Sequence, residues 1–306
     1  MIRLGLCCVF HDTPIKFKNT TATHAAKLTK KVRLEKLAGL CRHNAMTLAK
    51  AIEFCAASGI GSFRINSQIL PLKTHPDLGY DIKDLPSSDE ILGLFRGCGQ
   101  LAAENNIRLT FHPDQFVVFN SPRPEVVRSS IKELEYQAEV AEWVGADVIN
   151  IHGGGAYGVK RVALSFLEMN LNKLSERVRR RLTLENDDKI YTPDDLLPLC
   201  RKNGLPLVYD IHHHRCNPDR LSGEEATQQA LKTWNREPLF HISSPLEGWR
   251  GGKPARHHDY INIKDFPTFW FGFDLTVEVE AKAKEKAIKK LRRELMKKAP
   301  ESSIVI

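Results

Sequence analysis

The stretch 147–155, Asp-Val-Ile-Asn-Ile-His-Gly-Gly-Gly, contains the unit that decides the fold of this 306-residue chain. Its first five residues are rich in β-branched side chains and lack a clean polar–apolar alternation, which is typical of a strand covered on both faces. Amphipathic helical patterns flank the stretch at 124–145 and 160–180. Because neighbouring parallel strands need a crossover helix between them, this order of segments predicts a β/α repeat.

The same unit recurs along the chain. Eight short β-rich runs alternate with longer amphipathic stretches, and no Gly-x-Gly-x-x-Gly follows the first run. This pattern predicts an α/β fold, a closed (β/α)8 TIM barrel, because an open doubly wound sheet would have fewer repeats and a glycine-rich first turn. The β-rich runs lie at 2–10, 60–65, 107–111, 147–151, 181–184, 205–211, 239–243 and 272–279. The helical patterns lie at 31–57, 87–105, 124–145, 160–180, 192–203, 222–234 and 280–298.

The chain has no Pro-, Gly- or Ser-rich linker that would divide it into halves. We therefore expect residues 1–306 to form a single TIM-barrel domain that ends in a basic helix at about 280–299. No run approaches the ~20 apolar residues of a membrane helix, and the first residues read as a strand rather than a signal peptide. We expect a cytoplasmic protein without membrane contact.

Charge and cysteine content narrow the class of partner. Lys and Arg outnumber Asp and Glu by 45 to 37, a net charge of +8, which favours a polyanionic partner. In the basic run 282–298 a solvated helix face is an equally good interpretation, because acidic residues are interleaved there. The seven cysteines include no Cys-x2-Cys pair, which disfavours a disulfide framework and a thiolate zinc site.

Histidines and carboxylates gather at the predicted strand ends. Because the C-terminal ends of barrel strands meet at one mouth, residues far apart in sequence become neighbours there. Imidazole and carboxylate together suit Zn, Mn or Fe, and three crowded carboxylates need cations to offset their repulsion. The set at the strand ends is His112, His152, Glu185, Asp210, His213, His241, His257 and Glu280, and His75 lies in the long loop after the second strand.

Nine candidate ligands are more than one ion can use, so we predict two or three divalent ions that share carboxylates. A lone histidine at a strand end is more often simply hydrogen-bonded, but repetition over consecutive strands argues against that interpretation here. In the run 210–214, Asp-Ile-His-His-His, not every imidazole can point inward. We expect Asp210 and His213 to be ligands, and His212 and His214 to lie behind them or at the surface.

These segments together resemble the UV damage endonuclease family of DNA repair enzymes. The resemblance implies a TIM barrel akin to endonuclease IV, with a three-metal site of the Mn or Zn type. The matching segments, in order from residue 3 to about residue 285, are 3–5 (Arg-Leu-Gly), 75–76 (His-Pro), 111–116 (Phe-His-Pro-Asp-Gln-Phe), 150–155 (Asn-Ile-His-Gly-Gly-Gly), 184–188 (Leu-Glu-Asn-Asp-Asp), 209–214 (Tyr-Asp-Ile-His-His-His), 241–244 (His-Ile-Ser-Ser), 257–261 (His-His-Asp-Tyr-Ile) and 278–282.

The resemblance implies a metal-dependent endonuclease that nicks damaged duplex DNA immediately 5′ to a UV photoproduct and leaves a 3′-hydroxyl. It also implies that the nine residues named above are the metal ligands. Among them Glu185, Asp210 and Glu280 are expected to be catalytic, as bridging ligands or as bases. We expect a monomer whose partner is damaged double-stranded DNA.

Contacts with DNA are expected at two kinds of position. The resemblance implies that Gln115 and Phe116 probe the duplex opposite the lesion. The positive charge leads us to expect phosphate contacts from basic loops, although each of these side chains taken alone is more commonly just solvated. The residues expected to make them are Lys16, Lys18, Arg64 and Lys73.

The chain departs from the family's pattern at three positions. The family usually has a tyrosine and an asparagine near the lesion where this chain has Leu6 and Phe10, and some members have a lysine beside the metals at the position of Leu239. None of these changes removes a predicted ligand. Three other functions stay open: an abasic-site endonuclease of the endonuclease IV type, a metal-dependent sugar isomerase or epimerase, and a non-catalytic damage-binding barrel.

Overall fold

The eight strands of the computed structural model, which describes residues 1–298, close into one parallel barrel in chain order. The first strand pairs with the last, with Ile2 opposite Leu275, so the sheet has no free edge. The predicted (β/α)8 fold is confirmed. The strands are β1 (Ile2–Cys7), β2 (Ser62–Ile65), β3 (Arg108–Phe111), β4 (Val148–His152), β5 (Leu182–Glu185), β6 (Leu207–Asp210), β7 (Leu239–Ile242) and β8 (Leu275–Val279).

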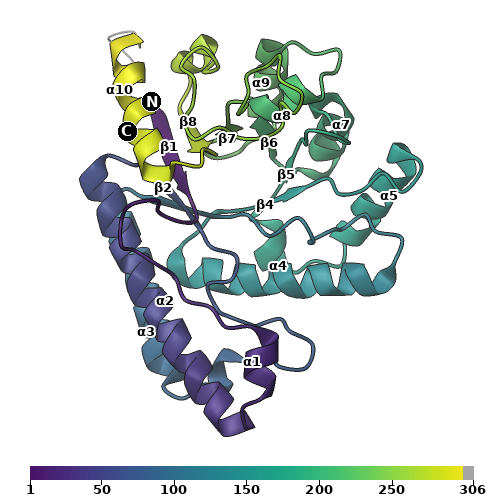
Figure 1. The fold of residues 1–306 in the computed structure, drawn as a ribbon. Helices are drawn as coiled ribbons and strands as arrows, with labels where there is room; N and C mark the ends of the chain where they lie inside the picture. Colours follow the sequence, from purple (N-terminus) through teal and green to yellow (C-terminus); the bar gives the residue numbers. More distant parts are fainter. Residues whose placement is uncertain (299–306) are drawn as a thin grey trace.

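Helices cover the outside of the barrel (Figure 1). Several begin and end where local chemistry dictates: Thr192 and Ser222 form capping boxes, and Gly59 ends the longest helix in the left-handed conformation that glycine adopts readily. In the described part of the chain no helix is both long and apolar enough to cross a membrane. The helices are α1 (Ala22–Ala26), α2 (Lys30–Ser58), η1 (Ile82–Asp84), α3 (Ser88–Glu104), α4 (Pro124–Val144), α5 (Lys160–Leu171), α6 (Glu176–Arg179), α7 (Pro193–Asn203), α8 (Ile211–Cys216), α9 (Gly223–Leu231), η2 (Thr268–Gly272) and α10 (Lys284–Lys298).

Two helix predictions need correction. The pattern at 160–180 contains two helices, because Ser175 has an extended backbone and donates from its N–H and its hydroxyl to the Glu135 carboxylate of α4. The basic helix predicted at about 280–299 begins only at Lys284, since the N–H groups of residues 282 and 283 bond to carbonyls of the loop before β8. Residue 299 lies outside the described residues.

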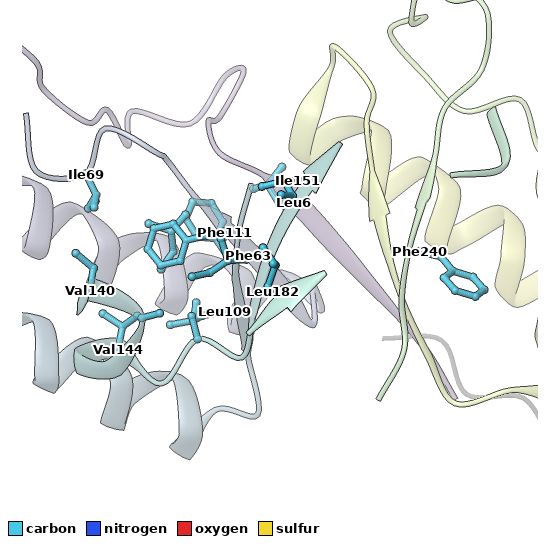
Figure 2. Packing of buried hydrophobic residues seen from close by; sticks show 14 of the residues in the cluster. Leu6, Phe63, Ile69, Leu109, Phe111, Val140, Val144, Ile151, Leu182 and Phe240 are labelled. Atoms are coloured by element: carbon cyan, nitrogen blue, oxygen red, sulfur yellow. The ribbon is translucent and has the colours of Figure 1, made fainter. Parts of the chain in front are cut away.

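The apolar core lies between the barrel and its helices. Outward-facing side chains such as Phe63, Leu109 and Phe111 are fully or almost fully buried, and they pack toward Val140 and Val144 of α4 (Figure 2). Burial of one such side chain contributes roughly 1.5–3 kcal/mol. This layer fixes the strands, and with them the side chains that alternate to the inside of the barrel.

The inside of the barrel is polar in its upper part and has a small apolar cluster beneath. Glu278 lies on β8 between outward-facing neighbours, and a period of two places Glu280 on the same side. Val148, Val208 and Leu239 pack together as a separate cluster. Because Leu239 precedes His241 by two residues on β7, this cluster lies one layer below the mouth.

Candidate metal centre at the barrel mouth

Seven of the nine predicted ligands converge at the C-terminal mouth, where they form three groups. Within each group three ligand atoms lie no more than 4.8 Å from one another. Glu185 and Asp210 each belong to two groups, so either carboxylate can bridge two neighbouring ions. The groups are His112, His152 and Glu185; Glu185, Asp210 and His213; and Asp210, His241 and Glu280.

The strands and one helix cap place these ligands. Glu185 and Asp210 are the last residues of β5 and β6, and both side chains are fully buried. Asp210 is also the N-cap of α8, and its Oδ1 accepts the N–H of His213 at 2.8 Å. A capping carboxylate bonds to the residue three positions later. The Asp-x-x-His spacing therefore brings both ligands to the same point.

The remaining two predicted ligands lie outside the three groups, and their role stays a prediction. His257 is at the rim, with Nδ1 3.8 Å from Oε2 of Glu280. His75 uses Nδ1 to accept the N–H groups of residues 77 and 78, so Nε2 is its one nitrogen that can bind a metal.

The residues at the mouth fit a bound metal. Buried polar atoms nearly always have a hydrogen-bond partner, and an unpaired one costs about 1–3 kcal/mol. Within residues 1–298 four atoms of the three groups are buried and make no hydrogen bond. Nitrogen and carboxylate oxygen together match the preference of Zn, Mn or Fe. The four atoms are Nδ1 of His152, Oε1 of Glu185, Oδ2 of Asp210 and Nδ1 of His241.

Hydrogen bonds on the far side of two histidines decide which nitrogen faces the site. Nδ1 of His112 lies 3.0 Å from the carbonyl of Pro113, which leaves Nε2 facing Glu185 at 2.9 Å. In His241, Nε2 lies 2.9 Å from Nη2 of Arg64 and 3.1 Å from Oε2 of Glu278, which leaves Nδ1 facing Oε1 of Glu185 at 3.1 Å. An outer carboxylate or carbonyl of this kind fixes the tautomer and orientation of a ligating imidazole.

Sequence reasoning missed Glu278. Its carboxylate is 1% exposed, accepts from Thr110 Oγ1, contacts His241 and forms an ion pair with Arg64. Burial raises the pKa of Glu278, but Arg64 and His241 more than offset this and lower it to about 2. The spacing of two between Glu278 and the predicted ligand Glu280 was the signal that could have found it, because strand residues two apart share a face.

The prediction that Arg64 lies in a basic loop is wrong. Arg64 belongs to β2, is 7% exposed, and places Nη1 2.8 Å from Oε1 of Glu280. Its guanidinium therefore lies inside the mouth, where it offsets the charge of Glu278 and Glu280. The alternation of β2 directs this side chain to the interior, and a composition argument cannot detect that.

The buried histidines and carboxylates at the mouth shift one another's pKa values. Burial raises the pKa of Glu185, but His241 and His152 lower it well below its usual value. Burial lowers the pKa of His241, but the Glu185 carboxylate more than offsets this and raises it to about 10. The histidines and carboxylates at the mouth thus favour one another's charged forms.

The other two histidines of the 210–214 run lie outside the three groups, as expected. His214 is held between the Tyr209 hydroxyl at 2.8 Å and Asp219 at 3.0 Å. His212 is fully buried, and neither of its ring nitrogens has a hydrogen-bond partner within the described chain. Its ring centroid lies 5.2 Å from that of His257, so it supports the rim of the site.

The loops around the mouth hold the residues predicted to contact DNA. Gln115 and Phe116 lie in the loop between β3 and α4, and Phe116 is 79% exposed. Lys16 and Lys18 are exposed in the loop after β1. Lys73 is turned inward: its side chain is 10% exposed, and Nζ donates to the carbonyl of residue 80 at 3.0 Å. Its position does not suit the phosphate contact that we predicted.

The side chains at the three departures from the family's pattern pack against apolar neighbours. Leu6 is fully buried in the layer between barrel and helices (Figure 2). Phe10 packs on Phe63, with ring centroids 5.9 Å apart. Leu239 belongs to the apolar cluster below the ligands. Leu6 and Leu239 thus fill protein interior, whereas Phe10 is partly buried.

A closed parallel barrel that gathers imidazoles and carboxylates at its mouth defines the class of (β/α)8 proteins with a candidate metal centre. Within this class, the chain belongs to the UV-endonuclease UvdE family, whose model matches residues 2–304. The predicted family resemblance is thereby confirmed.

Individual relatives agree with the family match. A UV DNA damage endonuclease of Bacillus velezensis is 34% identical over 303 residues, covering 94% of this chain and 91% of the relative. The crystal structure of SacUVDE superposes with a TM-score of 0.86 at 30% identity, covering 97% of this chain and 99% of that one. Endonuclease IV from Thermus thermophilus shares the fold, with a TM-score of 0.59 at 15% identity over 96% of this chain and 99% of that one.

Proposed function

We propose that this protein nicks duplex DNA immediately 5′ to UV photoproducts, with two or three divalent ions, Mn or Zn, held at the barrel mouth. Family membership supports the choice of UV-damaged DNA as substrate. The observation that carries the metal dependence is the set of four buried ligand atoms at the mouth that make no hydrogen bond, among which Nδ1 of His241 and Oε1 of Glu185 face each other at 3.1 Å.

The predicted ligands would have different roles, which follow from their positions at the mouth. When bound, divalent ions supply Lewis acidity, which offsets the charge of the phosphodiester and makes water a stronger acid. Glu185 and Asp210 would each hold two neighbouring ions, because each belongs to two groups. Glu280 is the most exposed carboxylate of the three, with 16% of its side chain accessible. Arg64 keeps Glu280 ionised, so its carboxylate can accept a proton from a water molecule at the mouth.

Glu278 would act as a positioning residue through His241. Its carboxylate and Nη2 of Arg64 both contact Nε2 of His241, so that Nδ1 faces the shared carboxylate of Glu185. Arg64 and Thr110 in turn hold the Glu278 carboxylate from two other directions. Partners of this kind typically contribute 10- to 100-fold to metal affinity.

Gln115 and Phe116 would enter the duplex opposite the lesion. Access to a photoproduct requires unstacking, which costs a few kcal/mol and least at a damaged step. Phe116 is 79% exposed, so stacking on an unpaired base would bury an aromatic face that now contacts water. Such stacking contributes about 1–3 kcal/mol per base. We also propose that one chain acts alone, because a single barrel supplies all the ligands of the three groups.

The test combines metal analysis with nicking of UV-irradiated plasmid. We expect the purified protein to contain Mn or Zn, to lose nicking after chelation and to regain it when the ion is added back. His112→Ala should lose both metal and nicking, whereas His43→Ala, on the outer helix α2, should keep both. Full nicking by metal-free protein would refute the metal site. Faster incision of an abasic duplex than of a pyrimidine-dimer duplex would replace this function by that of an abasic-site endonuclease.

A further inference from the structure

The segment from Lys16 to Lys36 carries most of the net charge of the chain. It contains seven Lys and Arg residues against one carboxylate, Glu35, a net charge of +6 compared with +8 for all 306 residues. The segment comprises the end of the loop after β1, helix α1 and the first two turns of α2. Its charge is thus concentrated in one short projection, which we call the α1–α2 projection.

The α1–α2 projection contacts the core through Phe17, Ala25 and Leu34, and its lysines lie on the outside. Helix α2 has 29 residues, about 43 Å at 1.5 Å per residue, whereas the neighbouring α3 has 17. The first fully buried residue of α2 is Leu37, and before it only Leu34 packs partly against the core. In Figure 1 α1 and the beginning of α2 stand at the bottom of the view, away from the strands. Lys27, Lys30 and Lys31 are exposed there.

The lysines of the α1–α2 projection lack the carboxylate partners that neutralise another basic segment of the chain. Within residues 1–298, Lys16, Lys27, Lys30 and Lys31 have no carboxylate within ion-pair distance, and Lys36 contacts only a histidine. The basic run 177–181, by contrast, pairs repeatedly with Glu135 and Glu142. Unpaired like charges held close together repel one another, and a polyanion relieves that repulsion.

The α1–α2 projection is continuous with the mouth of the barrel. Helices of this fold run antiparallel to the strands, so the beginning of α2 lies on the side of the strand ends. A groove of about 670 Å³ connects the two regions. Residues 19–22, which lead into α1, line one part of it, and His75, Asp114 and Phe116 of the mouth loops line another.

We propose that the α1–α2 projection binds the phosphate backbone of intact duplex beside the lesion. This inference rests on DNA being the substrate, and it adds a binding surface that takes no part in cutting. Duplex DNA carries one negative charge per ~1.7 Å of axis, which matches a row of unpaired lysines better than any small ligand does. The contact is independent of sequence and of damage, since it involves phosphates only. The phosphate contacts would keep the protein bound to the duplex while Phe116 contacts successive base-pair steps.

The experiment measures binding of an undamaged duplex of about 30 base pairs by fluorescence anisotropy, in chelator, between about 50 and 200 mM salt. The variant combines Lys27→Gln, Lys30→Gln and Lys31→Gln. The matched control combines Lys289→Gln, Arg293→Gln and Lys297→Gln on α10, whose later turns run away from the mouth. All six side chains are exposed, so both proteins should fold, as thermal unfolding will check.

We expect the slope of log Kd against log salt to fall by about 2.7 for the α1–α2 variant, so that it loses about 40-fold less affinity than the parent over this range. The control should keep the parental slope. On a photoproduct duplex the α1–α2 variant should show a raised KM and an unchanged kcat. Equal slopes in all three proteins would overturn the proposed surface. A parent protein that binds with the expected slope but nicks no UV-damaged duplex would refute the proposed function and leave the surface standing.

Discussion

The strand ends and the loops at the mouth of the barrel both carry residues of the candidate site but hold them differently. The strand-end ligands Glu185 and Asp210 are fully buried and fixed by the register of the sheet. Loop residues such as Phe116 are exposed, so a partner can contact them. We infer that the strand ends hold the groups whose geometry must stay fixed during the reaction. The loops hold the groups that must adapt to the shape of the DNA.

The largest effect should come from Glu185→Gln, which removes a carboxylate that two groups share. Loss of several kcal/mol of charge stabilisation corresponds to a fall in nicking rate of about a thousandfold. Metal content per chain, measured by mass spectrometry, should fall in the same protein while its circular dichroism stays that of a folded barrel. Normal metal content together with normal nicking would break the proposed role of the strand ends.

A smaller effect is expected from Glu278→Gln, because Glu278 belongs to none of the three groups and contacts the ligand His241 from behind. Metal affinity measured by calorimetry should fall 10- to 100-fold. The matched control is Glu237→Gln, another Glu that pairs with a barrel arginine, Arg3, but at the opposite end of the strands. Both variants should lose stability. Equal loss of metal affinity in the two would mean that Glu278 acts on the fold rather than on His241.

For the loops, Phe116→Ala should raise the KM for a photoproduct duplex about tenfold, the lower end of what base stacking contributes. Metal content and kcat should stay those of the parent, since Phe116 belongs to none of the three groups. Met296→Ala, which removes another exposed apolar side chain near the end of α10, should change nothing. A parallel loss of bound metal in Phe116→Ala would contradict the separation between loops and strand ends.

The smallest effect that we expect is a pH-dependent loss of stability at Glu237, which lies at the N-terminal end of the barrel strands. Burial raises the pKa of Glu237, but its bonds from Arg3 and Thr276 more than offset this and lower it. A lowered carboxyl pKa contributes stability that is present above the unfolded value and lost as pH falls through the folded value. We therefore expect acid to remove about 1 kcal/mol that Glu237→Gln lacks from the start. Urea unfolding at neutral and acidic pH will measure it; identical pH dependence in both proteins would contradict it.

Position in the repeat explains why so much of the site could be predicted. In a closed parallel barrel the C-terminal ends of all strands lie at the same mouth. Once the β/α repeat is recognised, His112, His152 and His241 are therefore expected to lie close together. The Asp210 and His213 pair needed only the spacing of a helix cap. These positions follow from local pattern.

The predictions for Arg64 and Lys73 were wrong, and Glu278 was missed, because the sequence does not show in which direction a side chain points. Arg64 and Lys73 looked like surface cations in composition, yet the first alternates into the barrel and the second bonds to a carbonyl of its own loop. Glu278 was overlooked because its importance comes from contacts with Arg64 and His241, which lie 214 and 37 residues away along the chain. Contacts across such distances are decided by packing, which no local pattern records.

The sequence by itself determined the barrel, its order of strands and the residue types at its mouth, because periodicity and strand-end position are properties of neighbouring residues. Tertiary structure alone decided which imidazole nitrogen faces the site, which cations are buried and which are exposed. Those choices depend on the low dielectric and the close packing inside the closed barrel, where each charge must find a partner that comes from another strand.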